Sequence, residues 1–296
     1  MRLMLLGGGN ALGQALIRLG AEEDIAFMAP RPPEEGWAPA SLTQLLDDHR
    51  PDAVVNLAYY FDWFQAESVS EQRLALQERA VERLAELCQH HQITLVQPSS
   101  YRVFDGSRAT AYSEKDEPLP LGLRGQALWR IEQSVRAACP QHVLLRFGWV
   151  LDESIDGLLG RFLTRAELPQ ELLLADDRRG NPTPVDDAAR VILSVLKQLD
   201  CNSPLWGTYH YAGNEATTPV ALGRRFLPRP ASIVSSRCRR QRRRPTPRAR
   251  MPAKSRRTPC WPARKSFTPS YQASCLACRL AASSGPVLSP WLMPPS

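Results

Sequence analysis

Seven residues near the start of the chain, Gly7-Gly8-Gly9-Asn10-Ala11-Leu12-Gly13, constrain the fold more than any other segment. The apolar run Arg2–Leu6 precedes them, and residues 14–19 follow at helical spacing, so we expect a strand, a tight turn and a helix. Such a turn lets a pyrophosphate approach bare backbone N–H groups, and the helix dipole favours its negative charge. The segment therefore predicts a dinucleotide-binding turn, with an ordinary strand–helix turn as the alternative.

The turn departs from the usual spacing at its middle position. Gly7 and Gly13 hold the outer positions of a GxxGxxG pattern, and Asn10 occupies the middle one. Asparagine tolerates left-handed backbone better than most residues, but it brings a side chain toward the phosphates. The residues expected to hold the pyrophosphate are Gly7, Gly9, Asn10, Ala11, Leu12 and Gly13.

Strand-like and helix-like segments alternate after this turn. Five or six such repeats by residue 151 predict an α/β fold, a Rossmann-like doubly wound parallel sheet with right-handed crossovers. Strands are expected at residues 24–29, 52–58, 93–96 and 142–150. Helices are expected at 42–46, with Ser41 as N-cap and an end before Pro51, and at 71–90 and 123–139. Farther on we expect helices at 157–167, 186–199 and 219–226, and strands at 171–175 and 206–212.

Two segments at the predicted carboxyl edge of the sheet bear on the cofactor. No acidic residue ends the second strand, and Arg31 stands 18 residues past Gly13. An arginine there can accept the 2′-phosphate of NADP, so the sequence favours NADP(H) over NAD(H), unless Arg31 simply points to solvent. Asn56, Leu57, Ala58 and Tyr59 end the third strand, and the aromatic run 59–64 either stacks on a nicotinamide or nucleobase or packs in the core.

Ser99 and Ser100 follow the next predicted strand. Hydroxyl groups in that place can hydrogen-bond a substrate carbonyl, or they can cap a local turn. Both readings stay open from the sequence.

Charge divides the chain near residue 227. Residues 1–227 carry 22 Lys/Arg and 30 Asp/Glu, whereas residues 228–296 carry 15 Lys/Arg and no acidic residue. The net charge of +7 therefore averages an acidic part and a basic part. The run 237–244 suggests phosphate contacts, but in a Pro/Ser-rich segment it is typical of a solvated, disordered tail, so we expect no nucleic-acid partner. Cys275-x-x-Cys278 is a single pair, so we expect no metal site.

The abrupt loss of acidic residues has a second explanation. Translation of a GC-rich gene in a shifted reading frame produces such a change, and sequencing the gene tests this hypothesis. No apolar run of 18 residues occurs, Met1 leads directly into a strand, and Cys88, Cys139 and Cys201 follow no pairing pattern. We therefore expect a cytoplasmic protein with no membrane partner.

The order of these motifs resembles the dTDP-4-dehydrorhamnose reductase family, extended short-chain dehydrogenase/reductases that act on sugar nucleotides. The resemblance covers residues 1–227. The matching pieces are the Gly7…Gly13 turn, Arg50–Asn56, Ser99-Ser100 with Val103–Gly106, Tyr112-x-Glu114-x-Asp116, Leu145-Arg146-x-x-Trp149, Gly180-x-Pro182-Thr183 with Asp187-x-Ala189, and Gly207-x-Tyr209-His210.

The resemblance implies a domain organisation and a ligand set. It implies a Rossmann domain over 1–150 that holds NADP(H) or NAD(H), and a partial substrate domain over 151–227 that closes over a nucleotide-linked sugar. Residues 228–296 would be the basic tail. Substrate contacts would come from Tyr101, Arg146, Trp149, Pro182 and Thr183. A homodimer is a further expectation.

The same resemblance places catalysis on a Ser/Thr, a Tyr and a Lys four residues after it. Ser99 or Ser100 can supply the hydroxyl, but the tyrosine position falls on Gly122 and the lysine position on Gln126. Tyr101, with Arg102 or Arg124, is a substitute pair, as is Tyr112 with Lys115 in the preceding loop. Because acid–base catalysis contributes roughly 10²–10⁴-fold, we expect weak reductase activity, or a non-catalytic protein that binds dinucleotide or sugar nucleotide.

Overall fold

The computed structural model describes residues 1–33, 36–59, 70–108, 110–152, 159–160, 163, 172–201, 205–226 and 233–236. Its largest element is a six-stranded sheet in the order β2-β1-β3-β4-β5-β9, in which every neighbouring pair is parallel. The strands are β1 (Arg2–Leu6), β2 (Ala26–Met28), β3 (Ala53–Asn56), β4 (Thr94–Ser100), β5 (His142–Phe147) and β9 (Gly207–Tyr211). This sheet confirms the predicted α/β, Rossmann-like fold.

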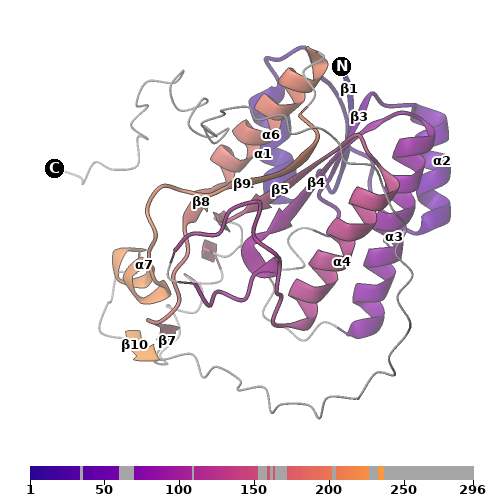
Figure 1. Cartoon of the computed structure of the whole chain (residues 1–296). Helices are drawn as coiled ribbons and strands as arrows, with labels where there is room; N and C mark the ends of the chain where they lie inside the picture. The colour runs from indigo at the N-terminus through magenta and orange to yellow at the C-terminus, as the bar shows by residue number, and fades with distance from the viewer. Residues whose placement is uncertain are drawn as a thin grey trace, which may run out of the picture. The chain divides into compact units, whose positions relative to one another are not determined.

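Helices cover both faces of the sheet (Figure 1). On one face, α1 (Ala11–Gly20) packs against α6 (Val185–Asp200). On the other, α3 (Glu71–His90) packs between α2 (Pro39–His49) and α4 (Leu123–Ala138). A Cβ on Gly20 would lie 2.6 Å from the Phe27 ring and 3.2 Å from Leu193, so α1 approaches its neighbours closely because residue 20 has no side chain.

The central strands are apolar because both of their faces are covered. Residues 3–6 of β1 and 53–56 of β3 are all buried, and so is every residue of β5. The covering helices contribute the leucine and valine side chains of their inner faces. Burial of this apolar surface is the main favourable term in the folding free energy.

The remaining strands form two small parallel pairs. β6 (Trp149–Leu151) pairs with β8 (Pro182–Pro184), and β7 (Leu172–Ala175) pairs with β10 (Ile233–Ser236). We expected one strand over 142–150, but the structure divides it at Gly148 into β5 and β6. A Cβ on Gly148 would lie 2.6 Å from the Asn181 carbonyl oxygen, so the chain leaves the main sheet at a point where only glycine fits.

Two elements beyond residue 150 belong to the layers of the main sheet. α6 and β9 lie beyond residue 150, yet α6 packs on α1 and β9 completes the main sheet beside β5. β10 lies inside the segment 228–296 and pairs with β7. The first compact unit accordingly runs from Met1 to Arg237.

Several predicted elements differ in their ends. α2 begins at Pro39 with Ala38 as N-cap, so the prediction of Ser41 as N-cap is wrong. Instead Ser41 Oγ lies in the first turn and accepts a hydrogen bond from the Ala38 N–H. The expected helix at 157–167 falls largely outside the described residues. α7 (Pro219–Phe226) has the predicted bounds, with Thr218 Oγ1 accepting from the Ala221 N–H. Among the described helices, none has the length and apolar character needed to cross a membrane.

Candidate functional site

The glycine turn lies between β1 and α1, at the carboxyl edge of the sheet. Gly7 has a φ of +84°, which only glycine adopts without strain. A Cβ there would lie 2.6 Å from the Leu57 carbonyl carbon, and a Cβ on Gly13 would lie 2.6 Å from the Gly8 Cα. Both glycines are therefore required for the close approach of α1, β1 and the end of β3. Gly9 stands exposed at the tip of the turn.

Asn10 is the N-cap of α1. Its Oδ1 accepts a hydrogen bond from the Gly13 N–H at 2.8 Å, and its Nδ2 donates to the Leu57 carbonyl oxygen at 3.0 Å. The N–H groups of Ala11 and Leu12 have no hydrogen-bond partner in the described part of the chain. A helix N-terminus with open N–H groups fits a phosphate, so the residues present fit a dinucleotide at this turn.

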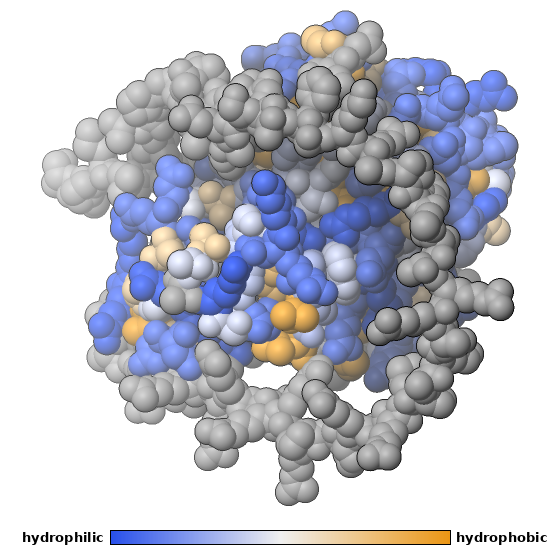
Figure 2. Space-filling view, viewed as in Figure 1, coloured by the Kyte–Doolittle hydropathy of each residue, from blue (hydrophilic) through white to orange (hydrophobic). Residues whose placement is uncertain are grey.

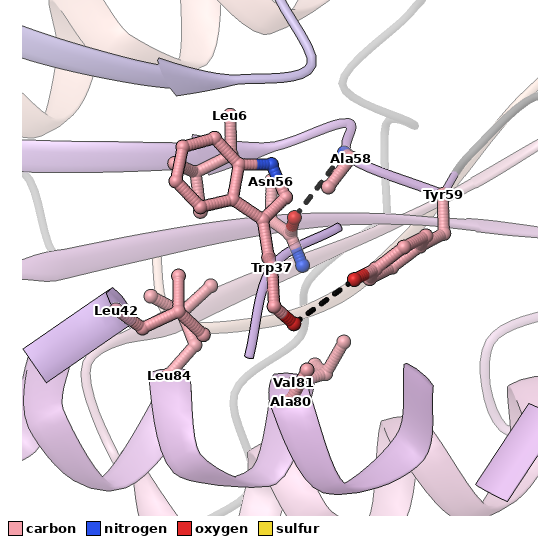
Figure 3. Close-up of a pocket in the computed structure, with 9 residues that line it drawn as sticks. All are labelled: Leu6, Trp37, Leu42, Asn56, Ala58, Tyr59, Ala80, Val81 and Leu84. Carbon is pink, nitrogen blue, oxygen red and sulfur yellow. Dashed lines mark hydrogen bonds between the residues drawn. The ribbon is translucent and has the colours of Figure 1, made fainter. Parts of the chain in front are cut away.

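A small apolar pocket adjoins the turn (Figure 3). Its free volume is about 10 Å³, room for about one water molecule. Trp37 lines it and is 7% exposed, and the Tyr59 hydroxyl donates to the Trp37 carbonyl oxygen at 3.1 Å. Its lining residues are Leu6, Trp37, Leu42, Asn56, Ala58, Tyr59, Ala80, Val81 and Leu84.

The end of β3 is held by a buried amide pair. Asn56 Nδ2 donates to Gln97 Oε1 at 2.8 Å, and Asn56 Oδ1 accepts from the Ala58 N–H at 3.3 Å. These bonds fix the backbone that leads from β3 into residues 57–59. The structure thus brings the predicted residues Asn56, Leu57, Ala58 and Tyr59 to the turn and the pocket, whereas residues 60–64 of the aromatic run lie outside the described residues. Arg31 is exposed after β2.

Ser99 and Ser100 form the end of β4 rather than the loop after it, and each is 1% exposed. Ser99 Oγ donates to Glu132 Oε1 at 2.6 Å. Ser100 Oγ accepts from the Arg102 N–H at 3.4 Å and caps the short 3₁₀ helix η2 (Tyr101–Val103). Of the two candidate hydroxyls, Ser99 is already committed to a buried carboxylate. Tyr101 beside them is 39% exposed.

Glu132 joins the serine to a buried arginine. Arg146 Nε and Nη2 donate to the Glu132 carboxylate at 2.9 and 2.6 Å, and both side chains are almost fully buried, at 2% and 0% exposure. Arg136 Nη2 adds a third donor at 2.9 Å. A carboxylate with this many charged donors is held firmly, so Arg146 is bound by protein rather than directed at a substrate.

His210 on β9 extends this network. Arg146 Nη1 donates to His210 Nε2 at 3.1 Å, so Nδ1 carries the proton and donates to the Tyr112 carbonyl oxygen at 3.3 Å. Burial lowers the pKa of His210 below its usual range; Glu114 opposes this effect and Arg146 adds to it. The imidazole is therefore neutral near pH 7.

An aromatic side chain packs at the centre of the same cluster. The Phe104 ring stacks on Tyr112 with centroids 4.4 Å apart, and the Arg146 guanidinium lies 5.1 Å from its centroid. Tyr112 donates its hydroxyl to Asp105 at 2.6 Å, and this bond lowers the pKa of Asp105. Glu114 accepts from the His210 N–H at 2.8 Å. These contacts hold Phe104, Tyr112 and Glu114 against His210 of β9.

One face of α4 approaches the serines. Glu132 on this face reaches Ser99, and a Cβ on Gly125 would lie 2.5 Å from the Arg102 carbonyl oxygen. Gln126 lies four residues before Arg130 and so on the same side of α4 as Arg130. The Arg130 guanidinium pairs with Glu78 of α3 at 2.6 Å. Gly122 is the N-cap, with open space around its Cβ position. α4 contains neither tyrosine nor lysine at any register.

Three other predicted substrate residues, Trp149, Pro182 and Thr183, lie in the paired strands β6 and β8. The Trp149 ring lies against Gly180, where a Cβ would meet the ring at 2.0 Å. Thr183 is fully buried, and its Oγ1 accepts from the Gly213 N–H at 3.1 Å. Pro182 is half-buried in β8. Tyr101 alone of the five predicted substrate residues has an exposed side chain.

Sequence reasoning missed Trp37, Glu132 and His210. The sequence did indicate that Glu132 is buried, because it lies beside the apolar helix positions Leu128, Ile131 and Val135. Arg146 likewise lies within an apolar strand. Two lone opposite charges in buried elements imply a pair. Trp37 had no such signal, because it follows a proline-rich loop. Within the described residues, no cluster of three His, Cys, Asp or Glu side chains is arranged to hold a metal ion.

Comparison with known proteins places this geometry in a family. Residues 1–260 match the family described as "RmlD substrate binding domain". A Streptomyces antibioticus protein named "Probable dTDP-4,6-dihydroxy-2-methyloxan-3-one 4-ketoreductase" is 32% identical over 262 residues, covering 79% of this chain and 86% of that protein. A Sinorhizobium fredii dTDP-4-dehydrorhamnose reductase is 26% identical over 227 residues, covering 76% of each chain.

A solved structure shows the same fold. The Bacillus anthracis dTDP-4-dehydrorhamnose reductase in complex with NADP superposes with a TM-score of 0.65 and 21% identity, covering 76% of this chain and 79% of that chain. The family match covers most of the chain and includes the glycine turn, both serines and the Glu132–Arg146 pair. The chain therefore belongs to the RmlD substrate binding domain family.

Proposed function

We propose that this chain is an NAD(P)-dependent oxidoreductase of the dTDP-4-dehydrorhamnose reductase type, acting on a nucleotide-linked 4-keto sugar. The observation that carries the proposal is the glycine turn beside an apolar pocket at the carboxyl edge of the sheet. The diphosphate would lie on the N–H groups of Ala11 and Leu12. The names of the relatives support the sugar nucleotide, and the exposed position of Arg31 leaves it able to take a 2′-phosphate.

A reduced nicotinamide would supply the hydride when bound, and the chain's own groups have to hold the substrate carbonyl and deliver a proton. Ser100 is the better candidate to hydrogen-bond the substrate carbonyl, because the Ser99 hydroxyl already donates a hydrogen bond to Glu132. Tyr101 is the candidate proton donor. Its phenol is exposed beside Ser100, and the Arg102 guanidinium lies 6.0 Å from its ring centroid.

A second candidate function follows from α4. Because this helix has neither tyrosine nor lysine, the usual proton-delivering pair is missing from it. The chain would then bind dinucleotide or sugar nucleotide without turnover, as a regulatory protein. NADPH oxidation with a dTDP-4-keto-6-deoxy sugar, measured beside NADPH binding by calorimetry, distinguishes the two functions. Binding with turnover supports the reductase, binding without turnover supports the regulatory protein, and no binding contradicts both.

A further inference from the structure

The Asn10 side chain joins the start of α1 to the residue after β3, at the point where the strand order reverses. β2 lies on one side of β1 and β3 on the other, so the switch point of the sheet lies between β1 and β3. Ligands of doubly wound sheets bind at this point, outside the carboxyl ends of the strands. Asn10 accepts from the Gly13 N–H of α1 on one side and donates to the Leu57 carbonyl oxygen after β3 on the other.

We propose that Asn10 is an intramolecular occupant of the diphosphate site, which a dinucleotide must displace in order to bind with all of its N–H donors. This inference rests on the proposed function and concerns the same site. It makes Asn10 a residue that sets the affinity for the dinucleotide.

The hydrogen bonds of Asn10 show what the side chain replaces. Its amide oxygen carries partial negative charge and accepts from the third residue of α1, as a phosphate oxygen would at a helix N-terminus. The N–H groups of Ala11 and Leu12 remain without a partner in the described residues, so two donors are ready and the third is taken. Asn10 has a φ of −83° and a ψ of 168°, so the backbone does not need glycine at this position.

The two hydrogen bonds also stabilise the chain without ligand. Oδ1 caps α1, and Nδ2 joins the turn to the end of β3. Removal of the side chain therefore lowers the stability of the chain while it frees the Gly13 N–H for a ligand. These opposite effects distinguish a side chain that occupies the site from one that only supports its structure. Loss of a purely structural side chain would lower both the stability of the chain and its affinity for the dinucleotide.

The experiment measures NADPH, ADP and adenosine binding to the full chain by calorimetry, together with thermal unfolding. Asn10→Ala should bind NADPH and ADP about 5- to 100-fold more tightly, the range expected when two hydrogen bonds of ordinary strength need not be broken. Adenosine carries no phosphate, so its affinity should not change. Asn10→Ser keeps an N-cap oxygen and loses the donor to Leu57, so it should give a smaller gain.

Thr218→Ala is the matched control, because it removes the cap of α7 away from the turn. It should lower the melting temperature and leave NADPH affinity unchanged. The inference is overturned if Asn10→Ala binds NADPH with equal or lower affinity, or if adenosine affinity rises by the same factor. Failure of every variant, including the wild type, to bind NADPH would instead contradict the proposed function, and the role of Asn10 with it.

Discussion

Ser99 donates a hydrogen bond to the carboxylate of Glu132 at 2.6 Å, and Glu132 is paired with Arg146 inside the protein. The bond joins the end of β4 to the inner face of α4, while Arg146 joins the same carboxylate to β5. Three elements of the site are therefore positioned by one buried acid. This has consequences for stability and for the choice between the two serines.

Glu132→Gln should destabilise the protein by about 3–5 kcal/mol, because it leaves the buried Arg146 charge without its partner. Urea unfolding followed by circular dichroism measures the change. Glu86→Gln is the control, since Glu86 pairs with Arg83 on the exposed surface of α3 and should cost less than about 1 kcal/mol. The double variant Glu132→Gln with Arg146→Met should recover much of the loss. Equal effects of the two single substitutions would contradict the structural role of the pair.

Substitutions of the hydroxyl groups should separate the candidate catalytic residues. If the chain turns over substrate, Ser100→Ala and Tyr101→Phe should each lower kcat about 10²-fold or more, because each removes a group that holds the carbonyl or supplies a proton. Ser99→Ala should act through stability instead, since its hydroxyl is bound to Glu132. NADPH oxidation at saturating substrate measures kcat. Turnover that survives both Ser100→Ala and Tyr101→Phe would exclude them from catalysis.

Gly7→Ala should abolish tight dinucleotide binding. The residue has a φ of +84°, and its Cβ would lie 2.6 Å from the Leu57 carbonyl group, so the turn has to move. Backbone strain of this kind costs about 1–3 kcal/mol before the contact itself is counted. Calorimetric titration with NADPH and thermal unfolding measure both effects. Gly9→Ala is the control, because open space surrounds its Cβ position and folding should be unchanged. A stable Gly7→Ala variant with normal NADPH affinity would show that the turn does not hold the diphosphate.

Stability should fall as the pH drops below about 6.5, and His210 should account for part of the fall. Burial lowers the pKa of His210 in the folded chain, so the unfolded chain binds the proton more readily. The contribution of His210 is complete above the unfolded pKa of about 6.5 and is lost between that value and the lower folded one. Protonation would also remove the acceptor for Arg146.

Urea unfolding from pH 5 to 8 measures this dependence for the wild type and for His210→Gln. The variant should show a flatter curve. Part of the slope remains, because burial also lowers the pKa of His142. Identical slopes for the two proteins would show that His210 is not the titrating group.

The sheet, its order of elements and the glycine turn could be predicted because each depends on local patterns. The run of apolar residues in β1 and the helical spacing after Gly13 are both read within a few neighbours. α3 has the bounds that its amphipathic pattern predicted, 71–90.

The site was less predictable because its contacts join residues far apart in the chain. The sequence left open whether Ser99 binds a substrate or caps a local turn, but its partner lies 33 residues later on another element. The division of the predicted strand 142–150 depends on Asn181, which no local pattern could reveal.

The place of β9 in the main sheet has a consequence for how the chain is made. Residues 1–150 contain five of the six strands, but the partner that covers the outer edge of β5 is Gly207–Tyr211, and the helix that covers α1 is Val185–Asp200. A chain emerging from the ribosome therefore exposes a bare strand edge and an uncovered helix until about sixty more residues have been added. The glycine turn of the amino-terminal half is therefore made well before β9 and α6 complete the layers around it.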